Sequence, residues 1–185
     1  MDGIRTAHVV AGVMRKILDL TIGAAAFLAC LLLATMVVVT FATIALRPFD
    51  VLIPGHEEIA TFAMVGMAFL GLPYAYRTGA HVRVETLLNQ LSQQNRARMD
   101  RWCVLAAFVI CVAFAYYAFW LVFDSYVFGD VSEGLLAIPR WIPQLPMLLG
   151  LALFGLALID DFLVLVRGGK ASFEIAQERG ATQAE

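Results

Sequence analysis

Four long runs of residues without a single charge constrain this chain more than any other feature. They are Leu20–Leu46, Ile59–Tyr76, Trp102–Phe123 and Trp141–Ile159. Each run approaches or exceeds the roughly 17–25 residues that a helix needs to cross a hydrocarbon core about 30 Å thick. A helix on the surface of a soluble protein would carry charged residues along one face. We therefore expect an all-α membrane protein with four transmembrane helices.

The composition agrees with a membrane protein of one domain. The hydrophobic share is 61% and the charged share is 15%, whereas soluble domains average about 45–50% and about 25%. We expect a single membrane domain, 1–185, with spans at about 17–46, 57–76, 102–124 and 143–166 and a frayed tail at about 168–185. The first run is longer than the roughly 7–15 apolar residues of a secretory signal and lacks a small-residue cleavage site, so it should remain as the first span.

The basic residues are divided unequally among the connections. Of the 13 Lys and Arg residues, Arg47 and Arg140 stand alone in the first and third connections, and all the others lie in the two tails and the central connection. Short cytoplasmic segments carry the excess of Lys and Arg. Both termini and the central connection should therefore be cytoplasmic. The two opposite loops are acidic and contain Asp50, Glu57, Glu58, Asp124, Asp130 and Glu133.

The central connection contains an amphipathic pattern. Val84, Leu87, Leu88 and Leu91 follow the i, i+3, i+4, i+7 spacing of one helical face. This spacing predicts a helix at about 82–94 that lies along the cytoplasmic membrane interface with its apolar face down. The nearby arginines have two open interpretations: contact with lipid phosphates or an acidic partner, or no more than the enforcement of topology.

Prolines mark two of the predicted span ends. Pro73 should kink or end the second span, because proline removes a backbone donor inside a helix. Pro143 and Pro146 suggest that the regular part of the fourth span begins between residues 144 and 147, after an interfacial or re-entrant lead-in at 138–141.

The adjacent pair Asp160 and Asp161 lies nearly two helical turns before Arg167. Successive helical residues point about 100° apart, so at least one of these two carboxylates should face a partner or a polar crevice. For this pair a structural role is favoured over an ion site.

The sequence offers no set of residues for catalysis or for a cofactor. Three histidines, His8, His56 and His81, fall outside the spans, which argues against a haem-bearing four-helix cytochrome. The cysteines, Cys30, Cys103 and Cys111, lie in or at the edge of apolar runs without a CxxC pattern, as expected of small buried hydrophobes. No HExxH motif, Ser/His pair or phosphate-binding glycine loop is visible. We expect neither an enzyme nor a cofactor.

The stretch Arg77-x-Gly79-Ala80-His81-Val82-Arg83-Val84-Glu85-x-x-Leu88, which follows Gly-Leu-Pro-Tyr at the end of the second span, resembles the small transmembrane subunit of TRAP (tripartite ATP-independent periplasmic) transporters. The start of the fourth span, Ile138-Pro139-Arg140-Trp141-Ile142-Pro143 with Leu145-Pro146, is similar to the same family. One departure is Glu85, where aspartate is common, and it preserves the charge. The resemblance extends over nearly the whole chain.

The resemblance implies a non-catalytic subunit of the bacterial inner membrane. Its partners would be a large membrane subunit, which holds the substrate and Na⁺ sites and moves as an elevator, and a periplasmic binding protein, which delivers an organic acid. The small subunit would brace the immobile scaffold, in contact with phospholipid and without a nucleic-acid partner. Candidate interface residues are Arg77, Gly79, His81, Arg83, Glu85 and Leu88 from the motif, and Asp160 and Asp161 from the fourth span.

A second hypothesis from another class stays open. A free-standing four-helix membrane protein, either a small carrier or a membrane chaperone, would share the same four spans. Uptake by the purified chain alone would favour that hypothesis over a transporter subunit.

Overall fold

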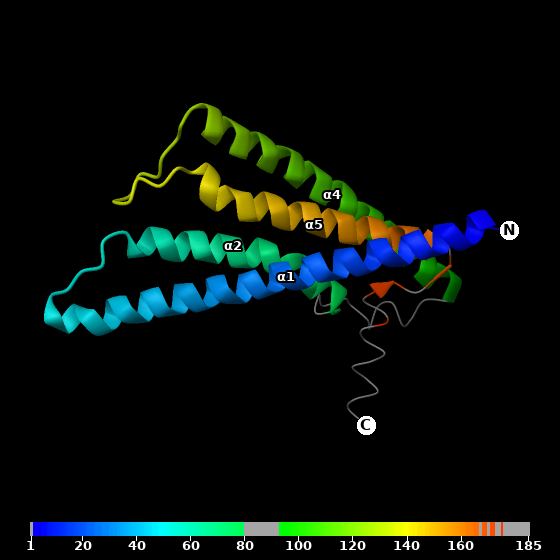
Figure 1. Cartoon of the computed structure of the whole chain (residues 1–185), viewed down its shortest axis with the longest axis horizontal. Helices are drawn as coiled ribbons and strands as arrows, with labels where there is room; N and C mark the ends of the chain where they lie inside the picture. The colour runs from blue at the N-terminus through cyan, green and yellow to red at the C-terminus, as the bar shows by residue number, and fades with distance from the viewer. Residues whose placement is uncertain (1, 80–92, 167, 170, 173–174, 176–185) are drawn as a thin grey trace, which may run out of the picture.

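The computed structural model describes residues 2–79, 93–166, 168–169, 171–172 and 175. Four long α-helices make up most of this part of the chain: α1 (Asp2–Leu46), α2 (His56–Arg77), α4 (Gln93–Val127) and α5 (Trp141–Val166), with a 3-10 turn, η1 (Arg47–Phe49), after α1 (Figure 1). All four are long and apolar enough to cross a membrane. The expected all-α class with four apolar helices is confirmed. The predicted interfacial helix at about 82–94 falls almost entirely on residues 80–92, outside the described residues.

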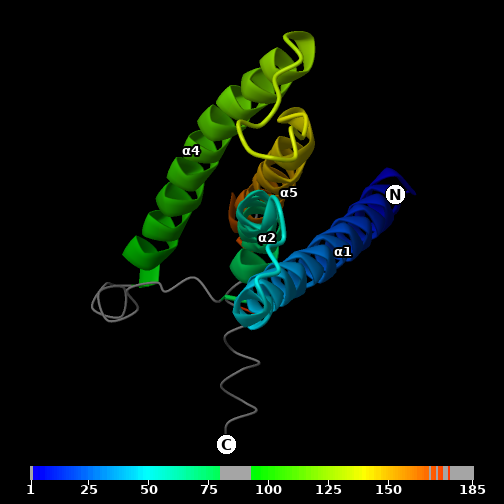
Figure 2. The ribbon, with the colours of Figure 1, turned by 90° about the vertical axis from the view of Figure 1, so that its left-hand side faces the viewer.

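The helices are arranged side by side in the order α1–α2–α5–α4, because α1 packs on α2, α2 on α5, and α5 on α4 (Figure 2). The loops 47–55 and 128–140 lie together at one end of the molecule, which we call the hairpin end (Figure 1). Arg77 and the last turn of α5 lie toward the opposite end, which we call the terminus end. At 1.5 Å per residue, the 45 residues of α1 span roughly 68 Å, so this helix is longer than a hydrocarbon core is thick.

Helices α2 and α5 approach each other closely at Gly150. A Cβ atom added at Gly150 would collide with the backbone carbonyl of Phe69. This carbonyl has no intrahelical donor, because the residue four positions later is Pro73, which has no N–H. Proline in α2 and glycine in α5 therefore allow the two backbones to come together.

One of the two alternatives predicted for Pro73, and the predicted start of the fourth span, need correction. Pro73 is fully buried and α2 continues past it to Arg77, so the proline does not end this helix. Helix α5 begins at Trp141, earlier than the expected start between residues 144 and 147. Pro143 falls in its first turn, where an N–H group would have no intrahelical partner, so that proline is compatible with the helix. Pro146 is accommodated inside the helix.

At the hairpin end, a side chain of α2 holds the loop between α4 and α5. The Glu58 carboxylate accepts hydrogen bonds from Ser132 Oγ at 3.0 Å and from the Leu136 backbone N–H at 3.2 Å. The hydroxyl of Ser132 in turn accepts from the Ile138 N–H at 3.2 Å, and Val131 forms an isolated bridge with Pro139. Residues 138–140 of the expected lead-in thus belong to the loop held at the end of α2, whereas Trp141 is already the first residue of α5.

Much of the apolar surface is not covered by the chain itself. In the most apolar stretches of α1 and α4, only 17% of residues are buried in each, against 28% in α2 and 33% in α5. Since α2 and α5 lie in the middle, the chain forms a layer with apolar faces and two apolar edge helices. Such faces are stable only against lipid or another membrane protein.

Candidate functional site

A cluster of charged side chains joins three helices near the terminus end. Its centre is Arg77, the last residue of α2. The helix stops there because Thr78 follows as its C-cap and Gly79 adopts a φ of 71°, a left-handed conformation that glycine takes without strain. The arginine side chain is therefore placed at the end of an apolar helix, where a charge can leave the hydrocarbon.

Arg77 binds one carboxylate on each of two other helices. Its Nη1 atom donates to Asp19 Oδ1 of α1 at 2.6 Å, and its Nη2 atom donates to Asp160 Oδ2 of α5 at 2.8 Å. The Arg77 side chain is only 10% exposed, whereas Asp19 is 53% and Asp160 is 25% exposed. Charge-assisted hydrogen bonds of this length are about twice as strong as neutral ones. One guanidinium thus connects α1, α2 and α5.

A second arginine connects the cluster to the segment after α5. Arg15 Nε lies 3.4 Å from Asp160 Oδ2, and Arg15 Nη2 donates to Ser172 Oγ at 3.0 Å. Ser172 in turn donates to Asp161 Oδ1 twice, through its hydroxyl at 2.6 Å and through its backbone N–H at 3.1 Å. Asp161 has no exposed surface. The two adjacent aspartates therefore face different partners: Asp160 faces the arginines, and Asp161 holds Ser172.

The chemistry of this cluster is suited to holding helices together through ion pairs. Arg15 and Arg77 provide two positive charges, and Asp19, Asp160 and Asp161 provide three negative ones. Within the described part of the chain, no group of three or more His, Cys, Asp or Glu residues is placed to hold a metal ion. Two buried atoms of the cluster, Arg77 Nε and Asp161 Oδ2, have no hydrogen-bond partner among the described residues.

The structure places four of the eight candidate residues. Arg77, Asp160 and Asp161 lie in the cluster, and Gly79 ends the helix beside it. The other four candidates, His81, Arg83, Glu85 and Leu88, lie outside the described residues.

Sequence reasoning missed three members of the cluster: Arg15, Asp19 and Ser172. Arg15 and Asp19 are four residues apart, so they share one face of α1, just before the first charge-free run. That spacing could have identified Arg15 and Asp19 as candidates for the cluster. No sequence pattern identifies Ser172, because its contacts depend on how the chain turns after α5.

The comparisons with known proteins agree with this architecture. Residues 36–168 match the family described as "Tripartite ATP-independent periplasmic transporters, DctQ component". The matched stretch contains Arg77, Asp160 and Asp161, whereas Arg15, Asp19 and Ser172 lie outside it. A search of curated proteins found no match. Because the family match covers well over half of a chain with four apolar helices, this protein belongs to the DctQ family, the non-catalytic small membrane component of TRAP transporters.

Proposed function

We propose that this chain braces a large membrane subunit that takes up an organic acid with Na⁺, after a periplasmic binding protein has delivered the acid. The observation that carries the proposal is the open layer of four helices. The edge helices α1 and α4 leave most of their apolar surface uncovered, which suits a scaffold that packs against a larger membrane protein.

The ion-pair cluster supports a static role. Arg77 connects α1, α2 and α5 near the terminus end, and Glu58 holds the loop over the end of α2 at the hairpin end. Helices fastened at both ends resist sliding against each other. A brace requires this property, whereas a moving transport domain would have to break such contacts.

The proposed orientation has both termini and the Arg77 end in the cytoplasm. Arg15 and Arg77 lie together in the cluster, whereas Arg47 and Arg140 lie in the two loops of the hairpin end. The excess of basic residues at the terminus end fits the positive-inside tendency. The acidic hairpin end would then face the periplasm and the binding protein.

The proposal is tested by assembly and by transport. The chain should co-purify with the tagged large subunit of its transporter. Proteoliposomes that contain both subunits should take up an organic acid only when Na⁺ and the periplasmic binding protein are added. Uptake of that acid by the chain alone, in proteoliposomes that lack the large subunit, would overturn the proposal.

Arg77 and Arg83 are further proposed to contribute to the joint with the large subunit or its lipid. The double variant Arg77→Ala/Arg83→Ala should lower the co-purification yield and leave membrane insertion intact. The matched control is Arg47→Ala/Arg140→Ala, which removes the same number of charges from the hairpin-side loops. Equal yields from both variants would reduce Arg77 and Arg83 to determinants of topology.

A further inference from the structure

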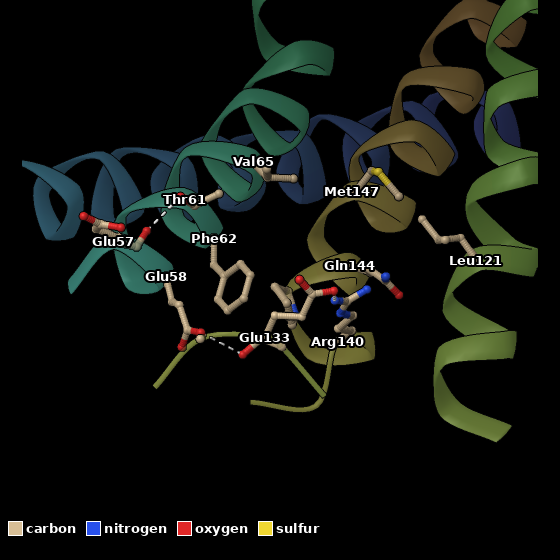
Figure 3. Close-up of a pocket in the computed structure, with 13 residues that line it drawn as sticks. Glu57, Glu58, Thr61, Phe62, Val65, Leu121, Glu133, Arg140, Gln144 and Met147 are labelled. Atoms are coloured by element: carbon tan, nitrogen blue, oxygen red, sulfur yellow. Dashed lines mark hydrogen bonds and ion pairs between the residues drawn. The ribbon is translucent and has the colours of Figure 1, made fainter. Parts of the chain in front are cut away.

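A cavity of about 520 Å³ opens at the hairpin end, away from the ion-pair cluster (Figure 3). Helices α2 and α4 both pack on α5, so α5 forms the floor of a groove between them. The loop between α4 and α5 closes one end of this groove. The volume of the cavity lies within the roughly 300–1,000 Å³ of typical ligand sites.

The deep part of the cavity is apolar. Phe62 and Val65 of α2, Leu121 of α4 and Met147 of α5 provide its walls and floor (Figure 3). These residues belong to the charge-free parts of three helices that are long and apolar enough to cross a membrane, so we infer that this part of the groove lies at the depth of the hydrocarbon core. An acyl chain fits such a surface because it exposes no polar group.

The mouth of the cavity carries charges of both signs. Arg140 is 42% exposed and pairs with Glu133 at 3.0 Å, and Glu133 itself is 92% exposed. Glu57 is 89% exposed at the start of α2. Arg140 also directly precedes α5, and the positive end of that helix's dipole attracts a phosphate. The mouth thus combines positions suited to a phosphate with positions suited to an ammonium group.

One polar atom at this mouth lacks a partner. The side-chain oxygen Oε1 of Gln144 is buried and has no hydrogen-bond partner among the described residues. Buried polar atoms in folded proteins are nearly always hydrogen-bonded. This oxygen can only accept, so the group that satisfies it must be a donor, and an ammonium group provides N–H donors.

Aromatic residues place this mouth at the depth of lipid headgroups. Trp141, the first residue of α5, packs edge-on against Tyr126 of α4, with ring centroids 5.9 Å apart. Trp and Tyr gather at the membrane–water interface. A molecule with its polar part at Arg140 and Gln144 would extend its apolar part along Val65 and Met147 toward the membrane centre.

We propose that this groove is a binding site for one phospholipid with an ammonium headgroup, of the phosphatidylethanolamine type. Its phosphate lies near Arg140 and the start of α5. Its ammonium group donates to Gln144 Oε1 and lies on the side of Glu133. One acyl chain fills the groove between α2 and α4. The lipid would fix the distance between these two helices, which belong to separate hairpins.

The test uses the full chain in nanodiscs that contain a trace of phosphatidylethanolamine or phosphatidylglycerol with a diazirine in the acyl chain. After illumination, peptide mapping should find adducts on α2 near Val65 and on α5 near Met147. The ammonium lipid should label these positions about tenfold more than the glycerol lipid, the equivalent of one charge-assisted hydrogen bond.

Three variants distinguish specific lipid binding in the groove from non-specific contact with membrane lipid. Val65→Trp fills the groove and should lower the labelling about tenfold, as expected for loss of about 1.4 kcal/mol of binding free energy. Gln144→Leu should keep the labelling and remove the preference for the ammonium lipid. The control Ala26→Trp fills a different groove, between α1 and α2, and should change neither.

Three results would overturn the proposal. They are equal labelling by the two lipids, labelling spread evenly over the exposed faces of α1 and α4, and an equal loss in Val65→Trp and Ala26→Trp. Gln144→Leu keeps the test decisive even if Val65→Trp does not fold, because it leaves the volume of the groove nearly unchanged. The readout needs no transport activity and is therefore independent of the proposed function.

Discussion

At the scale of single residues, Arg77 is the group that joins three helices through two ion pairs. Its two terminal nitrogens bind carboxylates from different helices, at 2.6 Å to Asp19 and at 2.8 Å to Asp160. Arg15 alone cannot replace it, because Arg15 lies 3.4 Å from Asp160 and also donates to Ser172. Removing the Arg77 side chain leaves carboxylates without their strongest partner. Lysine would bring one ammonium nitrogen in place of a planar fork.

We expect Arg77→Ala to destabilise the purified chain by about 1–3 kcal/mol, the range for a partner removed from a buried hydrogen bond. The matched control is Arg140→Ala, whose ion pair is largely exposed and should contribute about 0–1 kcal/mol. The measurement is the melting temperature in detergent, where Arg77→Lys should fall between Arg77→Ala and the wild type. Equal melting temperatures for Arg77→Ala and Arg140→Ala would contradict the central position of Arg77.

Part of this cluster could be predicted from the sequence. The charge at the end of an apolar run singles out Arg77, and the adjacent aspartates single out Asp160 and Asp161. Their pairing could not be predicted, because it depends on which helices are neighbours and how each is rotated about its axis. Neither property leaves a local signal in a helix that is apolar all round.

At the scale of helices, the contact between α2 and α5 depends on the combination of Pro73 and Gly150. Pro73 leaves the Phe69 carbonyl without its intrahelical donor, and Gly150 leaves room for that carbonyl. Small residues permit this kind of close helix packing in membranes. The sequence identifies Pro73 as a helix breaker, yet packing against α5 keeps α2 helical through to Arg77.

Gly150→Ala should therefore destabilise the chain by about 1–3 kcal/mol, the usual range for overpacking. Gly23→Ala is the matched control, because a Cβ atom at Gly23 has no atom within 4 Å. Alanine is a better helix former than glycine, so this control should be neutral or slightly stabilising. The comparison is the shift in melting temperature of each variant in the same detergent. A stable Gly150→Ala would mean that α2 and α5 do not approach each other at this point.

At the scale of the whole molecule, the helices form a layer rather than a closed bundle. Helices α1 and α4 lie at its two edges, and α2 and α5 lie between them (Figure 2). Charge patterning predicts the spans and their alternation across the membrane, but it carries no information about lateral order. The exposed apolar faces follow from the order, since an edge helix contacts only one main neighbour.

The order of the helices, α1–α2–α5–α4, predicts which pairs of introduced cysteines can form a disulfide in the intact chain. An ideal Cβ atom at Gly71 of α2 lies 3.9 Å from the Cβ atom of Ala29 of α1. Disulfides join Cβ atoms about 3.5–4.5 Å apart. With Cys30, Cys103 and Cys111 replaced by alanine, the pair Gly71→Cys/Ala29→Cys should form an internal disulfide on mild oxidation, detected by peptide mapping before and after reduction.

The control pair for this experiment is Gly71→Cys with Phe114→Cys, which joins α2 to an exposed position of the far edge helix α4. Because α5 lies between α2 and α4, this pair should stay reduced within one chain. A disulfide in the control pair and none in the first would require α4 rather than α1 beside α2. With α4 beside α2, helix α4 would no longer be an edge helix of the layer. That order would also change which surface is left for a larger membrane subunit.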